Sequence, residues 1–112
     1  MSYGKVLINK IKIGYYLYSI SGNDNDLLYI HNLEIYEKYR GKGLFSELIN
    51  NIINLAKLNN CKLIMLQPQH QTKTGYFKTT KNLRLLYSKY GFIECKIDKK
   101  FMQLTINTNK TI

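Results

Sequence analysis

The sequence predicts a single domain of the α/β class, a mixed β-sheet with helices packed against it. Its 112 residues suffice for one compact domain and are too few for two. Its composition, 45% hydrophobic and 21% charged, is that of a globular chain. Along residues 1–112 the hydrophobic period changes from that of strands to that of helices and back, which gives the element order βββαβαββ.

The first third of the chain has the pattern of three strands. Residues 5–8 are short and apolar, and residues 15–20 are rich in aromatic and β-branched side chains. The polar residues 21–26 predict a turn before the third strand, residues 27–35. Strict alternation along that strand predicts two faces, one with Leu27, Tyr29, His31, Leu33 and Ile35, and one with Leu28, Ile30, Asn32 and Glu34.

The next segment has a helical period. From Gly43 onward, apolar residues form one stripe of an amphipathic helix that we expect to end near residues 59–60. A polar stretch that contains His70 and Gly75 indicates a loop, and Gly91 closes a second, shorter helix. After the first helix we expect a strand at residues 63–66 and this loop at residues 69–82. The second helix is expected at residues 82–89, and two strands at residues 92–97 and 100–106.

The net charge of +10 favours an anionic partner. The excess lies in the second half of the chain, because residues 57–112 carry eleven basic and two acidic side chains, whereas residues 1–56 carry six and five. Such a field attracts a phosphorylated cofactor, a nucleic acid, an acidic membrane surface or an acidic protein, and it does not choose among them.

Several features predict an intracellular protein that binds no metal ion and does not span or bind a membrane. Cys61 and Cys95 lie far apart in the sequence and are expected to be buried free thiols. His70 has no second ligand at the spacing of a metal site, so no metal is expected. No apolar run approaches the ~20 residues of a membrane span, and the first residues lack the apolar stretch of a signal peptide. We therefore expect a cytoplasmic protein that does not bind membranes.

Residues 40–46, RGKGLFS, are the most informative segment. They connect the third strand to the first helix, and their glycines allow a sharp bend and the close approach of a ligand. The N–H groups of the first helical turn and the helix dipole favour an anion there, and Arg40 and Lys42 can add full charges. The segment fits neither the GxxxxGK[ST] nor the GxGxxG phosphate loop, nor an RNA-recognition motif. It predicts a phosphate or pyrophosphate site.

This segment and the later sequence LLYSKYGF, residues 85–92, together resemble the GCN5-related N-acetyltransferase family over roughly residues 27–106. The family loop R/Q-x-x-G-x-G/A is matched at Arg40 and Gly43, and Phe45 stands at its last position, where the family prefers Gly or Ala. Asn82 lies near the family's asparagine position but out of register. The family pattern LY.K.GF is matched at Leu86, Tyr87, Lys89, Gly91 and Phe92.

The resemblance implies a mostly antiparallel, twisted sheet flanked by helices, and transfer of an acetyl group from acetyl-coenzyme A to a primary amine of a small molecule or protein. In the family, backbone groups of the strand before the loop pair with the pantetheine arm, and the loop amides hold the pyrophosphate. The implied cofactor-binding residues are Leu33, Glu34, Ile35, Arg40, Gly41, Lys42, Gly43, Leu44, Phe45, Ser46, Asn82 and Lys89.

The resemblance also implies catalytic residues. Tyr87 aligns with the tyrosine that commonly protonates the departing thiolate. His31 and Glu34 are the candidate bases for the amine, and solvent is a third. Because alternation would direct the two side chains to opposite faces, at most one of them is expected to face the acetyl group, and His31 is preferred.

The family's early helices are missing or reduced to a pair of strands. This departure predicts an open acceptor site, or a wall supplied by a second subunit in a homodimer. The positive charge argues against polycationic acceptors. A rival hypothesis is a non-catalytic basic module for nucleic acid, which ten tyrosines and the net charge of +10 would serve. The sequence disfavours it, because the aromatic residues follow the period of strand cores.

Overall fold

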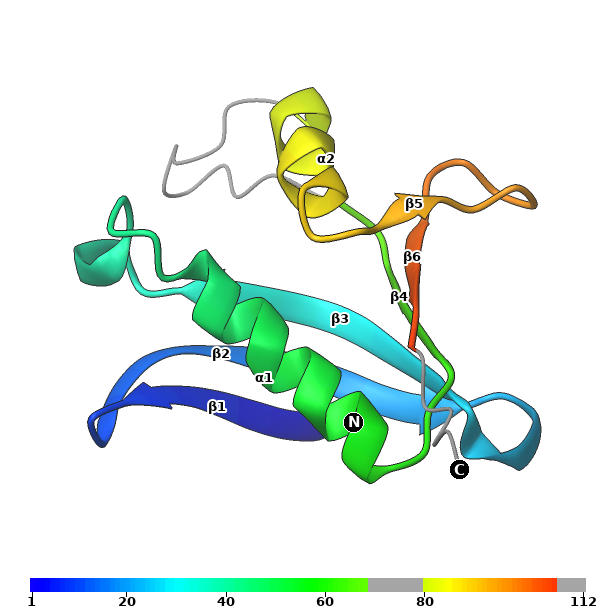
Figure 1. Cartoon of the computed structure of the whole chain (residues 1–112), viewed down its shortest axis with the longest axis horizontal. Helices are drawn as coiled ribbons and strands as arrows, with labels where there is room; N and C mark the ends of the chain where they lie inside the picture. The colour runs from blue at the N-terminus through cyan, green and yellow to red at the C-terminus, as the bar shows by residue number, and fades with distance from the viewer. Residues whose placement is uncertain (69–79, 107–112) are drawn as a thin grey trace, which may run out of the picture.

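A computed structural model describes residues 1–68 and 80–106, apart from the side chains of Thr80 and Lys81. It contains one six-stranded sheet with the order β1-β2-β3-β4-β6-β5 and two α-helices (Figure 1). The strands are β1 (Ser2–Ile8), β2 (Ile11–Ser21), β3 (Leu27–Ile35), β4 (Leu63–Leu66), β5 (Ile93–Glu94) and β6 (Met102–Thr105). The helices are α1 (Phe45–Leu58) and α2 (Thr80–Ser88), with two short 3₁₀ turns, η1 (Asn23–Asn25) and η2 (Glu37–Tyr39).

The predicted element order βββαβαββ and the mixed, mostly antiparallel sheet are confirmed. Several boundaries differ from the predicted ones: β1 and β2 begin earlier, at Ser2 and Ile11, α2 begins at Thr80, inside the predicted loop, and β5 is limited to Ile93–Glu94. The rest of that loop, with His70 and Gly75, lies outside the described residues. None of the helices among the described residues is long and apolar enough to cross a lipid bilayer.

One pair of neighbouring strands is parallel, and it sets the geometry of the site. β3 and β4 pair from Leu27 with Leu63 to Ile30 with Leu66, whereas all other neighbours in the sheet are antiparallel. α1 forms the crossover that a parallel pair requires (Figure 1). The last residues of β3, 31–35, continue beyond the end of this pairing. The two strands therefore separate at the carboxyl end of β3.

A β-bulge in β3 changes which side chains share a face. Leu17 of β2 pairs with Asn32 and Tyr18 pairs with Ile30, so His31 is an extra residue between them. The prediction that Leu33 and Ile35 share a face with His31 is therefore wrong. A bulge adds one residue without changing the sequence pattern, so strict alternation could not reveal it.

The sheet of β1–β3 has a core face, which packs against α1, and an open face on the other side. Tyr16 lies on the core face, since its hydroxyl donates to Asn51 Oδ1 of α1 at 2.6 Å. Leu33 pairs with Tyr16 across β2 and β3, which places it on the core face as well. The core-face residues of β3 are Leu28, Ile30, Leu33 and Ile35, and the open-face residues are Tyr29, His31, Asn32 and Glu34.

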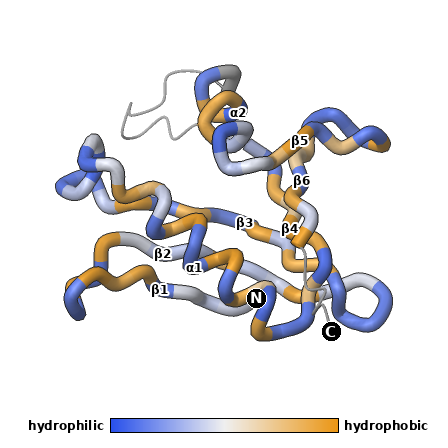
Figure 2. The backbone as a smooth tube through the Cα atoms, in the orientation of Figure 1, coloured by the Kyte–Doolittle hydropathy of each residue, from blue (hydrophilic) through white to orange (hydrophobic). Residues whose placement is uncertain are grey.

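The hydrophobic core lies between the sheet and α1. The buried residues of α1 are Leu48, Ile49, Ile52 and Ala56, and hydrophobic residues recur along this helix between hydrophilic ones (Figure 2). Cys61 and Cys95 are buried and free, as predicted. Because α1 is anchored along its length by these contacts, its amino end and the loop that enters it are held at the point where β3 and β4 separate.

Candidate functional site

The loop between β3 and α1 depends on two glycines. Gly41 and Gly43 adopt φ angles of +75° and +72°, which side-chain-bearing residues rarely adopt. A Cβ atom placed on either glycine would meet nothing within 4 Å. The backbone conformation, rather than a lack of room, is therefore what requires glycine, and the space in front of both residues is open to a ligand.

The amino end of α1 has no side-chain cap. Leu44 occupies the cap position and cannot accept a hydrogen bond through its side chain. The Ser46 hydroxyl donates to the Gly43 carbonyl oxygen at 3.4 Å, so it does not cap the first turn either. A 14-residue helix with an uncapped amino end directs N–H groups and the positive end of its dipole at the loop. An anion suits this position.

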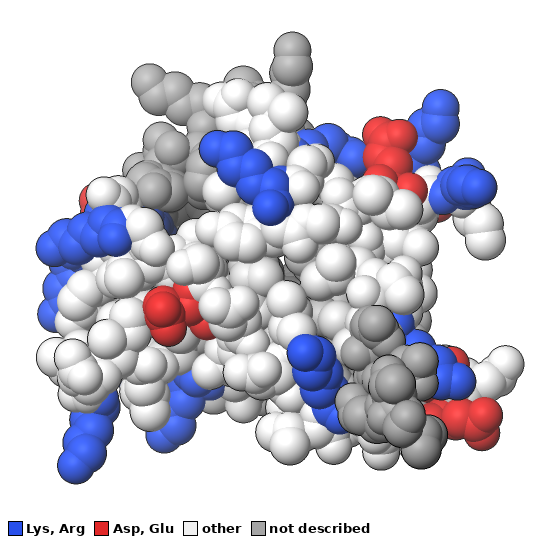
Figure 3. All heavy atoms as spheres, in the orientation of Figure 1, with Lys and Arg blue, Asp and Glu red and all other residues white. Residues whose placement is uncertain are grey.

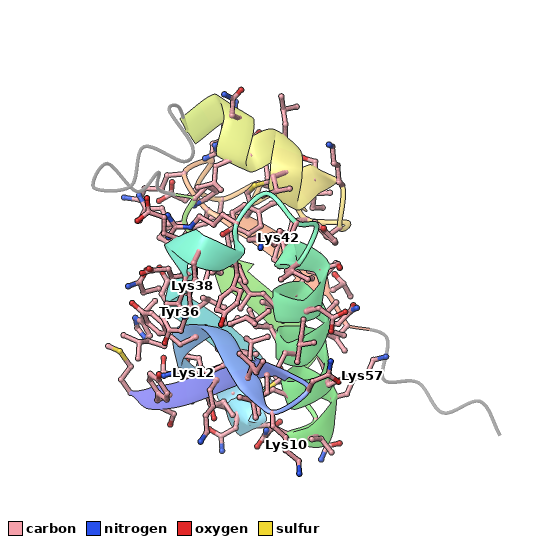
Figure 4. The ribbon with its side chains drawn as sticks, turned by 90° about the vertical axis from the view of Figure 1, so that its left-hand side faces the viewer. Lys10, Lys12, Tyr36, Lys38, Lys42 and Lys57 are labelled. Carbon is pink, nitrogen blue, oxygen red and sulfur yellow. The ribbon has the colours of Figure 1, made fainter. Side chains whose placement is uncertain are left out.

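The two cations of the loop are placed differently. The Arg40 side chain is 8% exposed and turns back to β3, where Nε donates to the Ile35 carbonyl oxygen at 2.6 Å and Nη2 lies 3.3 Å from Glu34 Oε2. Lys42 is exposed on the loop that enters α1 (Figure 4). The guanidinium of Arg40, which was expected to add its charge to the anion site, thus fastens the loop to the end of the strand.

Glu34 is engaged through both of its carboxylate oxygens. Oε2 pairs with Arg40, and Oε1 accepts a hydrogen bond from the Tyr15 hydroxyl at 3.4 Å. Burial, and secondarily the negative charge of Glu34, raises the pKa of Tyr15. Tyr15 is therefore a hydrogen-bond donor to the carboxylate at neutral pH. These contacts hold the Glu34 side chain against the strand and the loop.

His31 lies on the open face at the bulge. Its Nε2 atom is 2.8 Å from the Ser19 hydroxyl, and its ring contacts the Tyr29 ring edge-to-face with centroids 4.8 Å apart. The expectation that His31 and Glu34 point to opposite faces is wrong, because the bulge brings both to the open face. The geometric reason to exclude one of them as a base therefore disappears.

Tyr87 of α2 is 3% exposed and belongs to the hydrophobic core. Its ring packs edge-to-face against Phe45 and Phe92, with centroids 5.8 and 5.5 Å away. Burial raises the pKa of Tyr87 well above its usual range. The phenol therefore keeps its proton throughout the physiological pH range, and it lies beside the first residue of α1.

Phe45 has a structural role that its motif position did not suggest. Its ring contacts Tyr87 and also Tyr90, at 5.6 Å, so it joins the amino end of α1 to α2. The bulky residue at the Gly/Ala position thus packs into the aromatic cluster on the α2 side. Asn82 is exposed on α2, and Lys89 is exposed just beyond the end of that helix.

Sequence reasoning missed Tyr15 and Ser19, the β2 residues that contact Glu34 and His31. Their alternation in β2 places them on one face, which was a usable signal, but the bulge had to be known before they could be matched to β3. Among the described residues, no group of three or more His, Cys, Asp or Glu is placed to hold a metal ion.

The sheet with a separated parallel pair and the glycine loop before a long helix define an acyl-transferase type of fold. The sequence profile of the acetyltransferase (GNAT) family matches residues 2–92, and the chain belongs to this family. No curated protein sequence matches the chain significantly.

Solved structures with the same fold include two longer chains and one of about the same length. Tetrahymena GCN5 is 13% identical with a TM-score of 0.65, over 96% of this chain and 69% of that one. The ribosomal-protein-S18-alanine N-acetyltransferase from Escherichia coli is 15% identical with a TM-score of 0.66, over 93% and 68%. The anti-CRISPR protein AcrVA5 is 23% identical with a TM-score of 0.65, over 92% and 98%. The chain thus spans about two thirds of the first two and nearly all of the third.

Proposed function

We propose that this protein is an N-acetyltransferase that transfers the acetyl group of acetyl-coenzyme A to a primary amine. The observation that carries the proposal is the loop of Gly41 and Gly43, which is open to a ligand and leads into the uncapped amino end of α1. This junction lies beside the point where β3 and β4 separate, and the chain belongs to the GNAT family.

The proposed cofactor site has two parts. The amides of the loop and the first turn of α1 hold the pyrophosphate, with Lys42 as an exposed cation beside them, and Arg40 holds the loop in place through Glu34 and the Ile35 carbonyl. The backbone of residues 33–35 does not pair with β4, so its N–H and C=O groups on that side, apart from the Ile35 carbonyl that Arg40 occupies, can pair with the amides of the pantetheine arm. Phe45, Asn82 and Lys89 remain proposed cofactor contacts from the family motif.

The reaction forms a C–N bond and breaks the C–S bond of the thioester. The amine must first lose a proton, and the departing thiolate must gain one. We assign the second step to Tyr87, whose proton is retained at physiological pH. A thiolate that leaves into the same buried region also has its pKa raised by burial, which reduces the mismatch between donor and acceptor.

His31 is the preferred base. It is exposed on the open face, where an amine can reach it, and one ring nitrogen is positioned by Ser19. Glu34 is less suited, because both of its oxygens already accept hydrogen bonds or ion pairs from Tyr15 and Arg40. Water bound near His31 can carry the proton between the amine and the imidazole.

The test combines cofactor binding with product analysis. A concentration of acetyl-coenzyme A about 100 times its Kd should stabilise the folded chain by about 2.7 kcal/mol, seen as a raised melting temperature. Mass spectrometry of a panel of amines incubated with the protein and acetyl-coenzyme A should show a gain of one acetyl group. A salt-sensitive gel shift with mixed RNA or DNA, without any response to acetyl-coenzyme A, would instead support the nucleic-acid module.

A further inference from the structure

Three tyrosines and a lysine form an ordered cluster on the open face. The rings of Tyr3 and Tyr15 stack with centroids 5.7 Å apart, and the ring of Tyr36 lies 6.1 Å from that of Tyr15. Lys12 lies over the rings of Tyr3 and Tyr36, with Nζ 4.7 and 5.7 Å from their centroids, and donates a hydrogen bond to the Tyr3 hydroxyl. Tyr3, Lys12, Tyr15 and Tyr36 are called the tyrosine cluster below.

The tyrosine cluster is partly exposed to solvent, because Tyr3 is exposed and Lys12, Tyr15 and Tyr36 are half-buried. Tyr3 is 50% exposed, and Leu7, which pairs with Lys12 across β1 and β2, is 48% exposed. Figure 4 shows Tyr36, Lys12 and Lys38 on the side of the sheet away from α1. Tyrosine is one of the residue types enriched at the centres of protein–protein interfaces.

The tyrosine cluster is joined to the proposed reaction centre through β3. Tyr15 donates to Glu34, and Glu34 is three residues from His31 on the same face, a span of roughly 10 Å along a strand. The core face at this point is filled by Leu33 and Ile35, which pack beneath α1. An amine must therefore approach from the open face, and its carrier must cover roughly 10 Å to touch both His31 and the tyrosine cluster.

The charge around the tyrosine cluster is positive on balance, because Lys5, Lys12 and Lys38 outnumber Glu34 and Glu37. Lys5 pairs with Tyr15 across β1 and β2 and is exposed on the open face beside Lys12. The hydrogen bond from Lys12, aided by the charges of Lys12 and Lys5, lowers the pKa of Tyr3. The negative charge of Glu34 is offset by Arg40. Figure 3 views the molecule from the α1 side and shows lysine and arginine side chains at its left-hand end with acidic side chains among them; the open face lies on the far side of this view.

We propose that the acceptor amine belongs to a protein, which docks an acidic surface on the tyrosine cluster and presents a lysine or terminal amine to His31. This inference rests on the proposed acetyltransferase function and names its substrate class. Positive charge beside the path of the amine favours an acceptor with acidic neighbours and repels a basic tail. The size of the surface favours a macromolecule, because a small amine reaches only the His31 end.

The experiment compares three acceptors at equal concentration. They are a peptide with one lysine flanked by glutamates, the same peptide flanked by arginines, and the small amine N-acetyl-lysine amide. We expect the acidic peptide to have a kcat/KM at least about tenfold higher than either of the others, an advantage that falls as salt is added. Equal or better use of the small amine or of the basic peptide would overturn the inference.

Charge reversal locates the docking surface. Lys12→Glu should raise KM for the acidic peptide about tenfold, the size expected for a central interface contact, and leave KM for acetyl-coenzyme A unchanged. Lys57→Glu is the matched control, because Lys57 is exposed on α1, on the other side of the sheet (Figure 4). If both variants behave alike towards the acidic peptide, this surface does not bind the acceptor.

Two variants of Tyr3 distinguish the loss of a docking contact from a change in folding. Tyr3→Ala removes an exposed ring, and Tyr3→Phe keeps the ring but loses the hydroxyl that accepts from Lys12. We expect Tyr3→Ala to lower kcat/KM for the acidic peptide and Tyr3→Phe to retain most of the wild-type value. Acetyl-coenzyme A should still raise the melting temperature of both variants. Failure of that thermal response in the wild type would reject the proposed function itself, whereas acetylation that is indifferent to these variants rejects only the docking surface.

Discussion

The core face and the open face of β1–β3 are built from the same strands but are stabilised differently. On the core face, Val6, Ile13 and Leu28 are at most 2% exposed and pack into the hydrophobic core beneath α1. On the open face, side chains are linked by ring contacts and hydrogen bonds at the surface, as between Tyr29 and His31. The core face carries the free energy of folding, so the open face is free to carry recognition.

The proposed chemistry uses both sides of this division. Tyr87, the proposed proton donor, belongs to the hydrophobic core, and His31, the proposed base, lies on the open face. A proton would leave the amine on the solvent side, and another would reach the thiolate from the buried side. Substitutions in the hydrophobic core and on the open face should therefore affect stability, cofactor binding and turnover differently.

The largest effect is expected at the loop between the two faces. Gly43→Asp places a side chain at a φ of +72° and a negative charge at the amino end of α1, so acetyl-coenzyme A binding should be abolished. Calorimetric titration would measure the loss. Asn54→Asp adds the same charge at an exposed position of α1 and should bind the cofactor normally. Normal binding by Gly43→Asp would place the pyrophosphate elsewhere.

On the buried side, Tyr87→Phe should lower kcat by at least about 10²-fold, the usual contribution of a positioned acid, with little change in Kd for acetyl-coenzyme A. Because the pKa of Tyr87 is raised, the wild-type rate should show no alkaline decline from this group up to about pH 9. Rates measured from pH 6 to 9 provide the check. Full activity of Tyr87→Phe over that range would refute the proton-donor assignment.

A pair of substitutions in β3 compares the two faces directly. Leu28→Ala on the core face should lower the free energy of unfolding by about 2–5 kcal/mol, because Leu28 is fully buried. Asn32→Ala on the open face should change it by no more than about 1 kcal/mol, because Asn32 is exposed and its hydrogen bond to the Tyr15 hydroxyl is 3.5 Å long. Urea denaturation of both variants measures the difference. Similar losses at the two positions would mean that the faces do not divide stability from function.

At the bulge, His31→Ala should lower kcat/KM for the amine about tenfold, less than a full general-base effect because water can take the proton. Added imidazole should restore much of the rate, since the exposed position of His31 leaves room for it. Steady-state rates with and without imidazole give the answer. A loss that imidazole does not rescue would indicate a purely structural histidine.

The smallest effect is expected for the ion pair beneath the loop. Glu34→Gln weakens the hold of Arg40 and should raise KM for acetyl-coenzyme A a few-fold while kcat stays constant. The free energy of unfolding should change by no more than about 1 kcal/mol, since the Glu34 side chain is partly exposed. A fall in kcat with unchanged KM would instead make Glu34 the base.

The sequence predicted the fold well where structure follows local pattern. Strand and helix periods gave the order of the elements, β4 was placed at residues 63–66 and both thiols were correctly expected to be buried. The loop of Gly41 and Gly43 was recognised because left-handed backbone conformations require glycine.

The details that escaped prediction all depend on contacts between distant residues. The bulge at His31 is defined only by pairing with β2, and the inward turn of Arg40 depends on Glu34 and the end of β3. The contact of Phe45 with Tyr87 joins residues of two helices. Local periodicity contains no information about such contacts. These long-range contacts determine which side chains meet at the site.

The end of β3 has a consequence for handling the protein. Residues 31–35 continue past the end of the pairing with β4, so no strand among the described residues pairs with this edge of the segment, although Arg40 occupies the Ile35 carbonyl. Exposed strand edges promote self-association of protein chains. The pantetheine arm of coenzyme A, lying along this edge, would take the place of a neighbouring strand. Samples saturated with the cofactor should therefore stay monodisperse at protein concentrations where cofactor-free samples aggregate.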